Sequence, residues 1–479
     1  MNLTKHSVKK GLMKTFRITF GILTLLVNGI CTANEQAEQS TLTKQPNFII
    51  ILTDDQGYAD VGFNGSKDIR TPNIDRIANE GTKFTNGYVS YAVCGPSRAG
   101  LLTGRYQGRF GFGRNPVKDP TDSNAGMPLE EQMIAEVLKP VGYTSSIIGK
   151  WHMGLHPKFH PNKRGFDHFY GFLNGGHHYL PELLIHNDIY SLPKGGTDYA
   201  TKINHNGDVV EIDEYLTDEL SNEAVNFIER QQDNPFFLYL AYNAPHGPMQ
   251  ATKNYLDRNK HIKDKKRQTY AAMITAVDDG VGRVLNKLKE LDIDDNTLVF
   301  FLSDNGGSRK YPSSNAPLRG HKSDYFEGGI HVPFAVRWPG KIPAGQHYEN
   351  PVSSLDILGT FAALAKAPIA KERPLDGVNL MPFITGDDKG IPHEVLFWRN
   401  FDQGTLATRR GDSKVIHSQK EGDHLYNLTT DLAETNNLKE KNPDQFEQHK
   451  AEVKAWEKEL IDPVFSGLKK FQKKAKQTK

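Results

Sequence analysis

The sequence is poor in cysteine, with Cys31 and Cys94 as the only two thiols in 479 residues. So few thiols exclude a fold held by several disulfides and a zinc site built from cysteine clusters. A strong excess of charge is also absent, because 59 basic and 57 acidic residues give a net charge of +2. We therefore expect no nucleic-acid partner. Beyond the first residues, no apolar run is long enough to span a bilayer, so we expect no stable membrane insertion.

Residues 1–33 have the three-part form of a secretory signal peptide. The apolar run Phe20 to Val27 is followed by small residues ending at Ala33. A membrane anchor is the alternative, and the run is too short for it. Residues 34–45 are polar and predict a disordered linker. We predict an exported protein, periplasmic or secreted, whose net charge falls to −3 when the leader's five basic residues are removed; these are Lys5, Lys9, Lys10, Lys14 and Arg17.

Loss of Cys31 with the leader leaves Cys94 without a disulfide partner. A lone thiol in an exported protein calls for an explanation. A short helical run from Ser97 to Leu102 follows Cys94, and Gly104 can end that run. Amide groups at the helix N-terminus, together with Arg98, favour an anionic sulfur or oxygen at position 94. The simpler alternative is a small buried hydrophobe, which most free cysteines are.

Four apolar runs predict strands buried on both faces of a sheet. They lie at Asn47 to Thr53, Tyr143 to Gly149, Phe236 to Ala241 and Thr297 to Ser303. Helical patterns lie between them, notably at Glu214 to Arg230 and Gln268 to Leu291, and a shorter helix through Asn79 is expected to have Thr71 as its N-cap. This alternation predicts an α/β fold with a large mixed, mostly parallel sheet sandwiched by helices.

The pattern changes near Pro392, where short strand-like pieces alternate with turns. We predict a catalytic domain over residues 46–391 and a C-terminal subdomain over 392–479, made of a small antiparallel sheet and a packed helix. The predicted strands are Leu396 to Asn400, Thr405 to Arg409, Ser413 to His417 and His424 to Leu428, and the predicted helix is Phe446 to Leu460.

Polar residues follow each of the four buried strands. In an open α/β sheet the carboxyl ends of parallel strands share one rim, where ligands bind. Asp54-Asp55 and Asp304-Asn305 would supply oxygen ligands there, which favours Ca²⁺, or Mg²⁺, over zinc. Ordinary turn or capping residues are the alternative for either pair alone. Two such pairs at strand ends favour a cation site, because adjacent carboxylates repel each other unless a bound cation neutralises their charge.

The segment from Cys94 to Arg105 fits the pattern Cys-x-Pro-Ser-Arg-x-x-x-Leu-Thr-Gly-Arg at all eight specified positions. This pattern resembles the signature of type I sulfatases, arylsulfatase-like members of the alkaline phosphatase superfamily, and in particular bacterial polysaccharide sulfatases. Further motifs extend the resemblance over most of the chain: Asp54-Asp55-Gln56-Gly57, Gly149-Lys150-Trp151-His152, Pro245-His246, Asp304-Asn305-Gly306, Arg319-Gly320-His321-Lys322 and Leu425-Tyr426-Asn427-Leu428.

The resemblance implies a sulfuric ester hydrolase in which a separate maturase oxidises Cys94 to formylglycine. One Ca²⁺ per chain would be held by Asp54, Asp55, Asp304, Asn305 and residue 94. A hydroxyl of the hydrated aldehyde would attack sulfur, oriented by Arg98. His246 or Lys322 would protonate the leaving oxygen, and His152 would accept the proton of the second hydroxyl so that sulfate is expelled. Lys150, Lys322 and His246 would bind the sulfate.

The choice of substrate depends on residues outside these motifs. We expect His321, and His177 with His178 after the Gly175-Gly176 pair, to line sugar subsites together with Arg109 and Arg114. A solvated glycine-rich loop is the alternative. The basic run from Arg258 to Arg267 would grip further sulfates on a polymer, or is simply a solvated helix end.

An exported sulfatase of this build implies a sulfated oligo- or polysaccharide substrate, and the histidine-rich loop favours a galactan such as carrageenan. Three alternatives remain: an arylsulfatase of broad specificity, a phosphoester hydrolase of the same superfamily, and a glycan-binding protein in which Cys94 stays a thiol.

Overall fold

The computed structural model of the protein describes residues 44–193 and 196–468. The predicted signal peptide, most of the predicted linker and the basic tail from Lys469 lie outside these ranges. No helix among the described residues is both long and apolar enough to cross a lipid bilayer.

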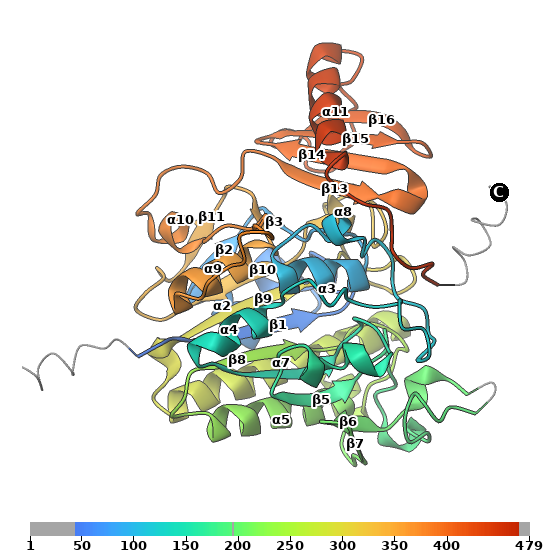
Figure 1. The fold of residues 1–479 in the computed structure, drawn as a ribbon, viewed down its shortest axis with the longest axis vertical. Coiled ribbons are helices and arrows are strands. Elements are labelled where there is room, and N and C mark those ends of the chain that lie inside the picture. The colour runs from blue at the N-terminus through green and yellow to red at the C-terminus, as the bar shows by residue number, and fades with distance from the viewer. Residues whose placement is uncertain (1–43, 194–195, 469–479) are drawn as a thin grey trace, which may run out of the picture. The chain divides into compact units, whose positions relative to one another are not determined.

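Five parallel strands form the centre of the large sheet (Figure 1). The residues of β1 are fully buried, and Ile50 pairs with Tyr239 of β8 on one side and with Phe300 of β9 on the other. The observed bounds of β1, β8 and β9 match the predicted strands. Those five strands, in sheet order, are β9 (Thr297–Ser303), β1 (Asn47–Thr53), β8 (Phe236–Ala241), β4 (Thr144–Lys150) and β5 (His168–Phe172).

Short strands extend the sheet at both edges, giving ten strands within the described residues. On one side β10 (Phe334–Arg337) runs antiparallel to β9 and is followed by β2 (Thr82–Phe84) and β11 (Gln346–Tyr348). On the other side lie β6 (Ile203–His205) and β7 (Asp208–Val210). A separate two-stranded sheet pairs β3 (Gly87–Tyr88) with β12 (Val352–Ser353). The large sheet is therefore mixed and mostly parallel, which confirms the predicted fold class.

Helices cover both faces of the sheet (Figure 1). Alternate residues of β1 accordingly pack in two different hydrophobic cores, one on each face. Phe48 and Ile50 pack in the core that contains α3, α4 and α9, whereas Ile49 and Ile51 pack in the core that contains α2, α5 and α7. The helices are α2 (Pro72–Asn79), α3 (Cys94–Thr103), α4 (Ile134–Leu138), α5 (Leu216–Arg230), α6 (Lys253–Arg258), α7 (Lys265–Glu290), α8 (Glu327–Ile330), α9 (Asp356–Ala365) and α10 (Met381–Thr385).

Thr71 occupies the N-cap position of α2 as predicted, but its side chain does not cap the helix. Its hydroxyl instead accepts a hydrogen bond from the Gly62 amide at 2.7 Å and bonds to Asp75. The free backbone amides at the start of α2 are bound by a residue of α7. The Asp278 carboxylate accepts hydrogen bonds from the amides of Asn73 and Ile74 at 2.9 and 2.8 Å. A tertiary contact thus replaces the local cap.

The C-terminal part contains the predicted antiparallel sheet with a helix against it. Its core is joined to the large sheet, since the Trp398 indole donates to the Val89 carbonyl at 2.8 Å and packs in the same apolar cluster as β1. From residue 46 onward the contacts form one compact unit, and the boundary at residue 392 stays a prediction. The elements are β13 (Leu396–Asn400), β14 (Thr405–Arg410), β15 (Ser413–Ser418), β16 (Gly422–Asn427) and α11 (Pro443–Glu457).

Candidate active site

Cys94 is the first residue of α3, a helix whose residues are all buried. Gly104 ends the helix in the left-handed conformation, with φ of 62°, as expected for a C-terminal glycine. The helix begins three residues before the predicted Ser97, because Pro96 fits its first turn. The Gly95 amide donates to Asn115 Oδ1 at 2.9 Å, and this oxygen lies 4.0 Å from Cys94 Sγ. Residue 94 therefore sits at a helix N-terminus beside an amide side chain.

The two acidic pairs meet because the strands before them are neighbours, with Thr53 of β1 opposite Ser303 of β9. The Asp55 amide donates to Asp304 Oδ1 at 3.3 Å, and Asn305 Nδ2 donates to Asp55 Oδ1 at 2.8 Å. Asp54, Asp55, Asp304 and Asn305 are all buried. Potential ligand atoms of Asp54, Cys94 and Asp304 lie within 4.8 Å of one another. Four residues from two distant motifs thus surround residue 94.

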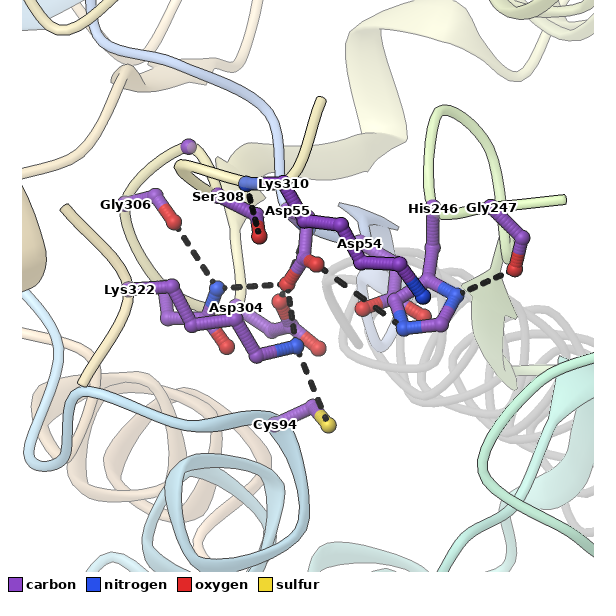
Figure 2. A network of polar contacts seen from close by, with 12 residues as sticks. Asp54, Asp55, Cys94, His246, Gly247, Asp304, Gly306, Ser308, Lys310 and Lys322 are labelled. Atoms are coloured by element: carbon purple, nitrogen blue, oxygen red, sulfur yellow. Dashed lines mark hydrogen bonds and ion pairs between the residues drawn. The ribbon is translucent and has the colours of Figure 1, made fainter. Parts of the chain in front are cut away.

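Three basic side chains balance this acidic set. Arg98 Nε donates to Asp304 Oδ2 at 2.9 Å, and its Nη1 donates to the Lys150 carbonyl at 3.2 Å. The Lys150 ammonium is fully buried and bonds to the Asp54 carboxylate. Figure 2 shows Lys322 reaching both Asp55, at 2.6 Å, and Cys94 Sγ, at 3.8 Å. The set therefore gathers both signs of charge among largely buried side chains.

The crowded carboxylates have different proton affinities. Burial and the neighbouring Asp54 raise the pKa of Asp304 to about 7. Burial would also raise the pKa of Asp54, but Lys150, His246 and Arg98 hold it below its ordinary value. Like charges this close oppose each other's ionisation until a cation neutralises them.

Two imidazoles border the acidic set. His152 follows β4 in the left-handed conformation, with φ of 62°, and its buried Nδ1 has no hydrogen-bond partner within residues 44–193 and 196–468. Burial, followed by Lys150 and Arg98, lowers the pKa of His152. His246 Nε2 lies 3.8 Å from Asp55 Oδ2 (Figure 2), and burial lowers its pKa as well. Burial thus favours the neutral form of both rings, while the charges of Asp54 and Asp55 oppose this effect at His246.

The donor set fits a hard divalent cation. Asp54 Oδ1 and Asn305 Oδ1 are buried and have no hydrogen-bond partner in the part of the chain that the structure describes, which suits oxygen atoms that bind a metal. The remaining donors are carboxylate oxygens and residue 94, whose sulfur would be replaced by an oxygen if Cys94 were oxidised as the resemblance implies. Oxygen ligands of this kind match Ca²⁺ better than zinc.

A pocket opens above Cys94, His152, His246 and Lys322. Much of its wall comes from irregular segments that sequence reasoning missed, because they have no periodicity and no motif to mark them. These segments contribute Asn115, Pro116, Val117, Lys118, Gly154, Leu155, Leu173, Asn174, Tyr199 and Leu468, whereas Gly175, which also lines the pocket, belongs to the glycine pair that the sequence had marked.

The structure does not place the expected subsite histidines in the wall of this pocket. His177 is fully buried and stacks on Phe172 with ring centroids 4.5 Å apart. This burial corrects the expectation that its ring touches sugar. His178 bonds to Gln250 at 3.0 Å, and His321 bonds to Asn315 at 3.2 Å. In that loop Gly175 faces the site, since it lines the pocket and lies against the ring of His152.

The two arginines expected at the subsites are held in ion pairs. Arg109 contacts Asp376 at 2.7 Å and Glu459 at 2.8 Å, and Arg114 contacts Asp402 at 2.6 Å. These pairs tie the segment after α3 to the C-terminal part of the chain. They give both arginines a structural role in place of the expected one.

The basic run from Arg258 to Arg267 covers the end of α6, a short connection and the start of α7. Asp264 caps α7 by accepting from the Arg267 amide at 2.7 Å. The side chains of Arg258 and Arg267 pair with Asp279 and Asp68. This arrangement favours the simpler of the two interpretations offered for the run.

Comparisons with known proteins agree with this geometry. The sulfatase family model matches residues 46–367. Human N-acetylgalactosamine-6-sulfatase is 37% identical over 355 residues, covering 70% of this chain and 65% of that protein. The chain thus aligns with slightly less than two thirds of the length of this curated relative.

Two solved structures extend the similarity. The structure of Ps i-CgsB in complex with k-i-k-neocarrahexaose has a TM-score of 0.84 and 40% identity, covering 91% of this chain and 97% of that one. The PsFucS1 sulfatase from Pseudoalteromonas sp. has a TM-score of 0.75 and 26% identity, covering 89% and 92%. With the family model matching most of the described residues, the chain belongs to the sulfatase family, a family of sulfuric ester hydrolases.

Proposed function

We propose that the protein is an exported sulfatase that hydrolyses sulfate esters of a sulfated galactan such as carrageenan, using formylglycine at position 94 and one Ca²⁺. The observation that carries this proposal is the position of Cys94, at a helix N-terminus and facing the acidic residues that follow β1 and β9. A thiol retained for packing alone would not need two ion-paired lysines and two histidines around it.

The proposed cation would be held by Asp54, Asp55, Asp304, Asn305 and residue 94, and would offset negative charge on the sulfate oxygens. Hydrated formylglycine would supply a hydroxyl as the nucleophile. Lys150 and Lys322 are close enough to the acidic set to share in binding the sulfate group.

The histidines then divide the proton transfers. His246, on the pocket wall beside Asp55, would donate to the leaving sugar oxygen in its protonated form, which the charges of Asp54 and Asp55 favour. Burial favours the neutral form of His152, and its buried Nδ1 has no hydrogen-bond partner among the described residues. It accepts the proton of the second hydroxyl, so that sulfate leaves and the aldehyde is restored. Arg98 holds Asp304 and the Lys150 carbonyl, which fixes the floor of the site.

A sulfated galactan is supported by the similarity to Ps i-CgsB, whose structure contains k-i-k-neocarrahexaose. Export to the periplasm or the medium is supported by the sequence of residues 1–33, and it would place the enzyme where polymeric glycans are found. The proposal also implies a maturase partner that acts on Cys94.

Mass analysis of the tryptic peptide spanning residues 84–98 tests the proposed nucleophile. Protein produced with a competent maturase is expected to carry an aldehyde or its hydrate at position 94 and to release sulfate from carrageenan oligosaccharides. The Cys94→Ala variant, made in the same cells, serves as the matched control and should release none. Undiminished sulfate release from protein with an unmodified thiol would refute the mechanism.

Metal removal tests the proposed cation separately. Chelation of the matured enzyme should abolish sulfate release, because the grouped carboxylates then lose the charge that neutralises them. Adding Ca²⁺ should restore the rate. Restoration by zinc alone, with release of phosphate from phosphoesters, would favour a phosphoester hydrolase instead.

A further inference from the structure

Lys118 is a second lysine on the wall of the pocket, in addition to Lys322, and it is not one of the residues that form the acidic and basic set near Cys94. It lines the pocket together with Tyr199. Its ammonium donates to Asp198 Oδ1 at 2.8 Å and lies 4.4 Å from the centroid of the Tyr199 ring. The Lys118 side chain is 50% exposed. An ammonium has three N–H donors, so Lys118 can bind an incoming anion while it keeps its contact with Asp198.

The groups that hold Lys118 are themselves fixed. The Asp198 side chain is 11% exposed, and its main-chain carbonyl accepts a hydrogen bond from the amide of Asn174. The Tyr199 carbonyl accepts from the His178 amide at 2.9 Å. The Tyr199 ring lies against Gly176, where an added Cβ would be 2.5 Å from Cζ. Lys118 is therefore held in place before a ligand arrives, which lowers the entropic cost of binding.

Lys322 differs from Lys118, although both line the pocket. The Lys322 ammonium is tied to Asp55 and lies near Cys94, so it belongs to the reacting centre. Lys118 makes its ion pair with Asp198, which does not belong to the acidic set around residue 94. The pocket thus offers two separate places for negative charge, one at the nucleophile and one on the wall.

We propose that Lys118 binds a second sulfate ester of the substrate, carried by a sugar next to the one whose sulfate is cleaved. The inference rests on the proposed function and deepens it, because it makes the enzyme selective for glycans with sulfates on neighbouring sugars. A lysine ammonium binds a sulfate oxygen as a point charge without requiring one fixed geometry. Asp198 and Tyr199 are positioning residues in this arrangement.

A binding experiment tests this selectivity independently of turnover. Purified Cys94→Ser protein is titrated with two galactan oligosaccharides of equal length, one with sulfates on two neighbouring sugars and one with a single sulfate. We expect the disulfated oligosaccharide to bind about tenfold more tightly, as one added charge-assisted hydrogen bond would give. Adding Lys118→Met should bring the ratio of the two dissociation constants close to one.

Three further variants separate a role in binding from a general loss of structure. Tyr199→Ala should reduce the ratio as Lys118→Met does, whereas Tyr199→Phe should keep it, because the ring that faces the ammonium remains. The matched control is Lys439→Met, since Lys439 also lies over a ring, 5.2 Å from Phe446, and pairs with Asp423 at 3.5 Å. It should keep the full ratio.

The inference is overturned if Lys118→Met leaves the ratio unchanged, or if the parent protein binds both oligosaccharides equally. Failure of the proposed function would look different. The matured wild-type enzyme would then release no sulfate from either oligosaccharide, while the ratio measured with the Cys94→Ser protein would still decide the role of Lys118.

Discussion

At the scale of single residues, the site depends as much on missing side chains as on present ones. Gly175 and Gly176 allow close approach of two rings, those of His152 and Tyr199. The sequence pattern drew attention to the histidines after this glycine pair, since titratable groups are the usual markers of a site. His177 is buried and packs in the protein interior. The residue of this loop that lines the pocket is Gly175, two positions earlier. Sequence alone cannot separate a histidine that lines a site from one that is buried, because exposure of a ring depends on tertiary contacts.

Gly175→Ala is expected to reduce kcat by about a hundredfold, because small displacements of catalytic groups carry costs of that order. An added Cβ would lie 2.5 Å from His152 Nε2, so the ring must move. The end of a side chain can shift without unfolding the protein, so thermal stability should change little. Steady-state sulfate release and a melting curve check both points.

Gly390→Ala is the control for this change. Gly390 is exposed, and its added Cβ would meet a movable Asp388 carboxylate at 3.1 Å. Activity should stay at the wild-type level. Wild-type kcat in Gly175→Ala would contradict the proposed role of His152.

At the scale of elements, the long buried strands and amphipathic helices follow from sequence periodicity alone. The five residues of the run Phe48 to Leu52 pack into both cores, which is why they form an uninterrupted apolar segment. The short outer strands β2, β6, β7, β10 and β11 pair with a neighbouring strand over only two to four residues, and such lengths carry no readable period. The acidic pairs were predictable for a related reason, as they directly follow strands that the pattern had located.

The N-terminus of α9 provides a pH-dependent contact. His393 Nε2 lies 2.7 Å from Asp356 Oδ1, and Asp356 also accepts from the Val378 amide at 2.9 Å. Burial opposes protonation of His393, but Asp356 outweighs it and raises the pKa. This contact should stabilise the fold fully below the unfolded pKa of about 6.5, and the stabilisation should fade as pH rises through the higher folded value.

His393→Gln is expected to remove this pH dependence. The difference in unfolding free energy between wild type and variant should be larger near pH 5.5 than near pH 8.5, by on the order of 1 kcal/mol. Urea unfolding at both pH values measures it. An equal difference at the two values would show that the ion pair does not stabilise the fold.

At the scale of the whole molecule, the C-terminal sheet is linked to the loop that carries Lys322. Lys414 of β15 is fully buried between Glu327 of α8, at 2.7 Å, and Glu434, at 2.9 Å. Glu434 also accepts from the Glu327 amide at 2.6 Å. Because α8 follows Lys322 by only a few residues, these contacts help to fix the position of Lys322, for which we propose a role in substrate binding, from the far part of the chain.

Lys414→Met should destabilise the protein by about 3–5 kcal/mol, since it leaves two buried carboxylates without their cation. Sulfate release should also fall, through the loop that carries Lys322. Adding Glu434→Gln should recover part of the stability by removing one of those charges. Urea unfolding compares these variants with Lys420→Met, an exposed surface change that should have little effect. Equal midpoints for Lys414→Met and Lys420→Met would contradict the role of this network.

The burial of α3 has a consequence for the order of events in biosynthesis. Cys94 is 2% exposed, and the helix that follows it has no exposed residue. A second enzyme could not seat this segment in its own active site once the surrounding strands have assembled. On the proposed mechanism, oxidation therefore comes before tertiary structure, and chains that collapse too early would remain permanently without a nucleophile.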